Sequence, residues 1–292
     1  MATKKENAAG EAAKKAEKTV ETVKDTGKKV SKEVIQTTQA SGKKVEHNIT
    51  HVDAQSTNAE ELQHITKGNA TPFRILAIVL WVLALGCEVV AILLFLKKIT
   101  FPIPPKNPIP NVWQAVIFLA LDLVFLIIGS QMWKKANHMD PASKKNKLAF
   151  WLQNNLGVIV AAVAFIPFII IALTDKNASK QDKTIAAIAA AVALAVGVLT
   201  GIDYNPVSQE DLQAEQQLIT SDVYWTAGGS VYHTHEDCGH LANSYNLAQG
   251  NVTAAIEHGK TRLCKTCAAK DEIVLPEDAV EDLGEVVENA AD

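Results

Sequence analysis

The first quarter of the chain lacks the side chains that build a soluble core. Its first 70 residues, out of 292, contain no aromatic residue and no apolar run of the kind that opens a secretory signal. A segment this polar cannot bury enough apolar surface to offset the entropy of ordering. Small apolar residues between Ala9 and Val34 follow only a weak heptad-like spacing. We therefore expect residues 1–73 to form a largely disordered or weakly helical tail.

Cysteine is scarce, and its distribution is uneven. The four cysteines are Cys87, which lies in an apolar run, and Cys238, Cys264 and Cys267 near the C-terminus. Three cysteines cannot pair completely as disulfides. The set is more typical of a thiolate metal site.

Basic residues are nearly absent from the last third of the chain. Residues 203–292 contain 4 Lys/Arg against 17 Asp/Glu, whereas residues 1–202 contain 24 against 15. Phosphate binding needs concentrated Lys and Arg, so we expect no nucleic-acid partner. The final residues, 271–292, hold nine acidic and no basic residues, which predicts a mostly disordered acidic tail.

Long apolar runs dominate the middle of the chain. Each is close to the roughly 20 residues that a helix needs to cross a bilayer. They predict an all-α membrane bundle of four transmembrane helices within residues 74–202, surrounded by lipid. The predicted spans are 74–96, 112–132, 148–173 and 184–202, and a linker ending in a short polar helix follows at 203–221.

An even number of spans places both termini on the same side of the membrane. Near the membrane, seven basic residues lie on the side of the two termini and six lie on the opposite side. This difference is too small to determine the orientation by the positive-inside rule. The long hydrophilic N-terminal segment favours the cytoplasm, because its translocation would be demanding. We expect a multi-pass protein of the cell membrane with both termini cytoplasmic.

Two carboxylic residues interrupt the apolar runs. Glu88 and Asp122 lie well inside the first two, and no run contains a Lys or Arg that could pair with them. Such residues usually face the bundle interior and often carry function, here a proton or cation pathway. The alternative is a polar contact that keeps the helices in register. Protonation, or hydrogen bonding to nearby amides, could satisfy them; the candidates are Gln114, Gln153, Asn154 and Asn155.

The fourth run repeats small residues every four positions, which allows another helix to approach closely. This face could pack within the chain or support helix self-association. It consists of Ala189, Ala193, Gly197 and Gly201.

Residues 222–270 hold the remaining cysteines among several histidines, which predicts a small α+β, zinc-ribbon-like module. Cys264 and Cys267 form a tight pair, and Cys238 supplies a third sulfur. A structural zinc site needs one further ligand. If 223–225 and 230–232 form a hairpin, His233 lies where it ends, so geometry favours His233, with His235 as the alternative. His240 is too close to Cys238, and His258 is expected to face solvent. Four protein ligands leave no open position for catalysis, so we expect no enzyme activity.

The pattern VYWT-x2-G-x2-YH-x4-C-x2-L, followed by G-K-x3-C-K-x-C, resembles a small zinc-binding-like module found at the ends of many bacterial membrane proteins and secreted nucleases. In that family the histidine after Tyr matches His233. A looser similarity runs to the metal-binding domain of Ada-type repair proteins, where a cysteine of the first pair accepts a methyl group. His233 stands at the first position of that pair, with one extra intervening residue, which argues against methyl transfer.

These patterns favour a membrane-anchored adaptor, scaffold or sensor whose zinc module binds a protein partner or the membrane surface. A small transporter or channel subunit using Glu88 and Asp122 is the second hypothesis, with the zinc module as its regulatory domain.

Overall fold

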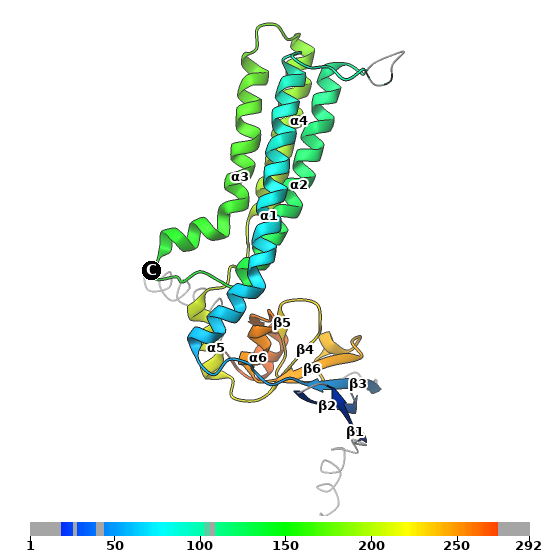
Figure 1. The fold of residues 1–292 in the computed structure, drawn as a ribbon, viewed down its shortest axis with the longest axis vertical. Helices are drawn as coiled ribbons and strands as arrows, with labels where there is room; N and C mark the ends of the chain where they lie inside the picture. The colour runs from blue at the N-terminus through cyan, green and yellow to red at the C-terminus, as the bar shows by residue number, and fades with distance from the viewer. Residues whose placement is uncertain (1–18, 26–27, 39–43, 103, 105–108, 274–292) are drawn as a thin grey trace, which may run out of the picture. The chain divides into compact units, whose positions relative to one another are not determined.

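The computed structural model describes residues 19–25, 28–38, 44–102, 104 and 109–273 (Figure 1). The chain divides into two compact units. One is Ala59–Gln213, and the other joins Met1–Asn58 to Ala214–Asp292. The predictions for residues 1–18 and for the acidic tail beyond residue 273 concern parts of the chain outside the described residues.

Four long helices make up the first unit and run alongside one another (Figure 1). All four are long and apolar enough to cross a membrane, as predicted. They are α1 (Ala59–Phe95), α2 (Asn111–Met139), α3 (Lys147–Thr174) and α4 (Lys180–Gly201). Helix α1 begins well before its predicted span, within the segment expected to be a tail. A short helix, α5 (Gln209–Leu218), follows in the predicted linker.

Many large apolar side chains point out of this bundle, and small residues fill much of its interior beside a few large ones such as Phe165 and Phe168. On α1, Ala77, Ala84 and Ala91 are fully buried. Ile75 and Val82, offset by two residues, are 58% and 62% exposed. A water-soluble bundle would bury its larger apolar residues and place polar ones outside. The arrangement instead suits helices that pack through small residues while hydrocarbon contacts the outer face.

The small-residue face of α4 is used inside the chain. Ala193, Gly197 and Gly201 are buried, while Ala189 is only partly so. A Cβ atom on Gly201 would lie 3.0 Å from the backbone of Gly157 and Val158 in α3. Helix α3 therefore packs on this face at Gly197 and Gly201, whereas self-association through the face stays a prediction.

The second unit contains a five-stranded sheet in the order β1-β2-β3-β6-β4. The pairings are antiparallel except for β3 and β6, which are parallel. A separate parallel pair joins β5 to β7. The sheet strands are β1 (Thr19–Asp25), β2 (Lys28–Thr38), β3 (Lys44–His51), β4 (Val223–Trp225) and β6 (Asn246–Gly250). The pair is β5 (Val231–Tyr232) and β7 (Arg262–Leu263).

The described residues 19–25, 28–38 and 44–51 form strands, where the sequence predicted disorder or a weak helix. In β3, His47 and Ile49 are buried and the residues between them are not, which is the two-residue period of a half-buried strand. His47 Nδ1 also donates to the Ser244 carbonyl at 2.8 Å. The partner strand lies almost 200 residues away, so local composition carries no sign of the pairing.

The β3–β6 pairing has a consequence for topology. Asn48 faces Asn246 and His51 faces Gln249 in one ladder. Residues that share a ladder cannot lie on opposite sides of a bilayer. If the four long helices cross a membrane, the segments before α1 and after α4 share one side of it, which an even number of crossings allows.

The close contact of α3 with α4 predicts that Gly201→Ala destabilises the bundle by about 1–3 kcal/mol, because the added methyl group meets backbone that cannot move independently. Gly86→Ala is the matched control, since a Cβ atom there meets nothing within 4 Å. Thermal unfolding of both variants in detergent should show a lower midpoint for Gly201→Ala only. Equal midpoints would contradict this packing.

Candidate metal centre

A hairpin places the first ligand. Strand β4 and the residues after β5 form an antiparallel bridge in which Tyr224 and His233 exchange two backbone hydrogen bonds of 2.7 and 2.8 Å. The chain reverses at Gly228 and Gly229, and the positive φ of Gly229, 73°, is readily adopted only by glycine. This bridge is the only ladder contact between the two segments among the described residues, because β4 otherwise pairs with β6 and β5 with β7. The predicted hairpin of 223–225 with 230–232 therefore forms only in part, and His233 lies at its single bridge.

A second pairing brings the CxxC segment to the same place. Tyr232 lies opposite Leu263 in the parallel β5–β7 pair, and the Cys264 N–H donates to the Tyr232 carbonyl at 2.9 Å. Parallel strands end at the same edge, so the residues that follow them, His233 and Cys264, are neighbours. Cys267 lies in the first turn of the next helix, α7 (Lys265–Lys270).

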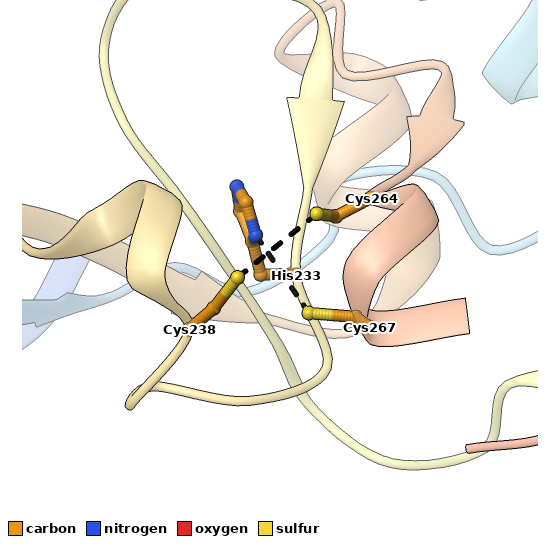
Figure 2. A group of neighbouring side chains, drawn as sticks. All are labelled: His233, Cys238, Cys264 and Cys267. Carbon is orange, nitrogen blue, oxygen red and sulfur yellow. Dashed lines mark hydrogen bonds between the residues drawn. The ribbon is translucent and has the colours of Figure 1, made fainter. Parts of the chain in front are cut away.

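The four predicted ligands converge. Cys238 precedes the short helix η1 (Gly239–Leu241), and its Sγ lies 4.0 Å from Cys264 Sγ. Cys267 Sγ lies 3.8 Å from His233 Nδ1. One ligand atom from each residue lies within 4.8 Å of all the others, and all four residues are buried (Figure 2). Tetrahedral zinc ligands stand roughly 3.3–3.8 Å apart, so the cluster is close to the size that a metal ion requires.

Burial keeps His233 and Cys238 uncharged at neutral pH. Burial, with a smaller effect of His240, lowers the pKa of His233 to about 4, so a nitrogen lone pair is available at neutral pH. Burial also raises the pKa of the Cys238 thiol to about 12, outweighing a hydrogen bond from the His240 backbone. Metal coordination removes the proton from a thiol and supplies the charge that this buried site otherwise lacks.

The other three histidines have different partners. His235 Nε2 lies 2.5 Å from Asp271 Oδ1, and His240 Nε2 lies 3.1 Å from Thr266 Oγ1. His258 is exposed, as expected, and its Nδ1 donates to the Ala254 carbonyl. The structure therefore selects His233 over His235 as the fourth member of the cluster.

Asp271 joins the two halves of the cluster from outside it. Its second carboxylate oxygen accepts a hydrogen bond from Thr234 Oγ1, beside His233. The hydrogen bond from Thr234 and the interaction with His235 hold the pKa of Asp271 below its usual range. Because Asp271 ends α7, the segment after His233 is tied to the helix that carries Cys267.

Lys260 supports the hairpin in a way that sequence reasoning missed. The residue is 3% exposed, and its Nζ donates to the carbonyls of Ala227, Gly228 and Gly229 at 3.2, 3.1 and 2.8 Å. The turn before His233 is thus held by an ammonium group from the segment before Cys264. The Gly-Lys step of the quoted pattern was the available signal.

Two buried glutamates were also missed. Glu215 of α5 accepts a hydrogen bond from the hydroxyl of Tyr232, the residue before His233. Glu257, in α6 (Val252–Glu257), accepts hydrogen bonds from the backbone N–H groups of Gln55 and Ser56 and from the Ser56 hydroxyl. These contacts connect the cluster's surroundings to α5 and to the N-terminal segment.

The CxxC pair lies between a strand and a helix. Cys264 directly follows β7 and occupies the N-cap position of α7. Redox CxxC pairs occupy a similar strand-to-helix position, so position does not argue against redox chemistry. The metal interpretation rests on the convergence of Cys238 and His233 on the pair.

Glu88 and Asp122 form a second polar site, on α1 and α2. Both are buried, and their carboxyl groups lie close enough to interact with each other. None of the amides proposed as their partners bonds to either carboxyl group. Gln114 bonds to the backbone of Phe101 and Ile109, Gln153 pairs with Asn137, and Asn155 donates to the Trp151 carbonyl. Asn154 accepts from Asn137 at 3.5 Å, and its own Nδ2 has no hydrogen-bond partner among the described residues.

Comparison with known proteins adds no family: the chain matches no family model, no curated protein and no solved structure. Fold and site define a class, a four-helix chain with the properties of a membrane protein and a buried Cys3His cluster that could hold a metal ion.

The cluster predicts that His233→Ala removes most bound metal from the full-length protein purified in detergent, whereas His235→Ala retains it. The reason is that only the His233 nitrogen lies among the sulfurs. Metal content per chain, measured by plasma mass spectrometry, distinguishes the two. Loss of metal from His235→Ala with retention in His233→Ala would exclude this ligand set.

Proposed function

We propose that the chain is an integral membrane protein that presents a structural zinc module for binding a protein partner or the membrane surface, as an adaptor, scaffold or sensor. The observation that carries the proposal is the convergence of His233, Cys238, Cys264 and Cys267 in a unit to which both ends of the helical bundle lead. The chain enters the helical unit from this unit and returns to it afterwards, so the two units are joined by two connections.

Zinc is the metal that best suits these ligands. Three thiolates and one imidazole form a soft, tetrahedral set, which is typical of structural zinc. Four protein ligands leave no position for water or substrate, so the ion would hold the module together and perform no chemistry. The resemblance of the surrounding pattern to zinc-binding-like modules supports the same choice.

We place the module in the cytoplasm. The long hydrophilic N-terminal segment would be difficult to translocate, and free thiols persist in a reducing compartment. All four cysteines are unpaired, including the three of the cluster. A partner would there contact the surface of the module. Residues 222–270 hold four Lys/Arg and four Asp/Glu, so they lack the concentrated positive charge that nucleic-acid binding needs.

This function predicts partner binding that depends on the metal. Cys264→Ser should release zinc and unfold the module. The variant, expressed at full length in its native membrane, should then lose the crosslinks to partner proteins that the native chain forms. Cys87→Ser is the matched control, because Cys87 lies outside the cluster and should retain both zinc and partners. Identical crosslinks for the native protein and both variants would contradict the proposal.

A second function, a small transporter or channel subunit with the zinc module as its regulatory domain, is favoured by one observation. Glu88 and Asp122 are 4% and 0% exposed and face each other within the bundle. Intramembrane carboxyl groups that face a bundle interior are common in proton and cation pathways.

Transport predicts that liposomes containing the protein take up protons or monovalent cations, and that Glu88→Gln or Asp122→Asn reduces uptake to the rate of empty liposomes. Glu60→Gln, at an exposed acid of the same helix, is the control and should be unchanged. Fluorescent pH and cation indicators measure the flux. Uptake that survives both substitutions would exclude a pathway through the pair.

A further inference from the structure

The intramembrane pair of acids has an unusual hydrogen-bonding state. All four carboxyl oxygens of Glu88 and Asp122 are buried, and none accepts a hydrogen bond from a donor in the described residues. The two groups nevertheless lie within hydrogen-bonding range of each other. Two carboxylates cannot bond, since both only accept. Their contact becomes a hydrogen bond only when one of them carries a proton.

The charged residues of the four helices also indicate that one of the two carboxyl groups carries a proton. Between Arg74 and Lys97, the only charged residue of α1 is Glu88, and Asp122 is the only one of α2 before Lys134. Helix α3 has no charged residue after Lys147, and α4 has none after Lys183. Among the residues that the structure describes, the other titratable group that interacts with the pair is the Cys87 thiol, which is neutral or negative. The helices thus supply no cation to neutralise two adjacent negative charges in a medium of low dielectric constant.

The surroundings are too apolar for a metal ion. Ala84 and Ala91 flank Glu88 along α1, and Leu119 and Leu126 flank Asp122 along α2; all four are at most 2% exposed. Calcium requires six to eight oxygen ligands and magnesium a nearly octahedral set. Two carboxyl groups among alanine and leucine side chains cannot complete either set. A proton requires only the two oxygens that already face each other.

From this geometry we infer that Glu88 and Asp122 form a proton-binding site within the helical bundle and hold at least one proton between them at neutral pH. The protonated carboxyl group donates a hydrogen bond to the other carboxyl group. The proton also removes one of the two negative charges of the pair. The site joins α1 to α2 whether or not the chain transports ions, so it does not depend on the transport candidate.

Infrared difference spectroscopy of the full-length protein in lipid vesicles at pH 7 tests the site. A protonated carboxyl group has a carbonyl stretch well separated from that of a carboxylate, and the stretch shifts in D2O. The native protein minus the isosteric double variant Glu88→Gln/Asp122→Asn should show this band with the intensity of one or two carboxyl groups. Absence of the band would overturn the inference.

Two further measurements complete the test. One applies if the double variant does not fold, and the other distinguishes a bound proton from a bound metal cation. If the double variant does not fold, native protein labelled with carboxyl-13C glutamate or aspartate should show a shifted acid band, because exposed acids contribute only carboxylate bands at this pH. Addition of sodium, magnesium or calcium should leave the band in place. Its loss on addition of a cation would identify a metal site instead, and would overturn proton binding without affecting the zinc module.

Discussion

The pairing of β3 with β6 is the constraint on which the rest of the structure depends. It joins a strand that precedes α1 to a strand that follows α4. If the four long apolar helices cross a bilayer, this ladder requires an even number of crossings. The same pairing makes the N-terminal segment part of the sheet beside the metal cluster, where Glu257 fixes the residues that lead into α1.

The metal cluster, in turn, depends on short-range geometry. The parallel β5–β7 pair aligns His233 with Cys264, and Lys260 fixes the turn that sets the hairpin register. A one-residue change of register would turn His233 away and present a neighbouring side chain instead. The selection of His233 over His235 is thus a property of backbone pairing, and the nearest competing ring is held by Asp271.

The sequence was sufficient where a single local property decides the structure. The length of the apolar runs determines the four helices, because few other structures satisfy the backbone in hydrocarbon. Ligand type and spacing identified Cys238, Cys264 and Cys267, and the strand-like residues before His233 indicated its place. The face of α4 was correctly read as a packing surface, but its partner, α3, could not be distinguished from a second chain by spacing alone.

Sequence reasoning was insufficient where pairing is distant or where polar residues are buried. Nothing in the composition of residues 44–51 indicates a partner almost 200 residues later. Three buried charged residues look like surface residues in the sequence. Their burial is explained only by their partners, which are backbone carbonyls for Lys260, a tyrosine hydroxyl for Glu215 and backbone N–H groups for Glu257. Glu88 and Asp122 were recognised as intramembrane acids, but their contact with each other depends on how α1 and α2 are rotated.

The distance between β3 and β6 along the chain also affects biosynthesis. About 195 residues separate the end of β3 from the start of β6. At about 5–20 residues per second, roughly 10–40 s pass before the ribosome supplies the partner strand. During this interval β3 has an open edge on which other strands could add. Cys264 and Cys267 emerge later still, so all four long helices are synthesised before the sheet can close and before the Cys/His cluster is complete.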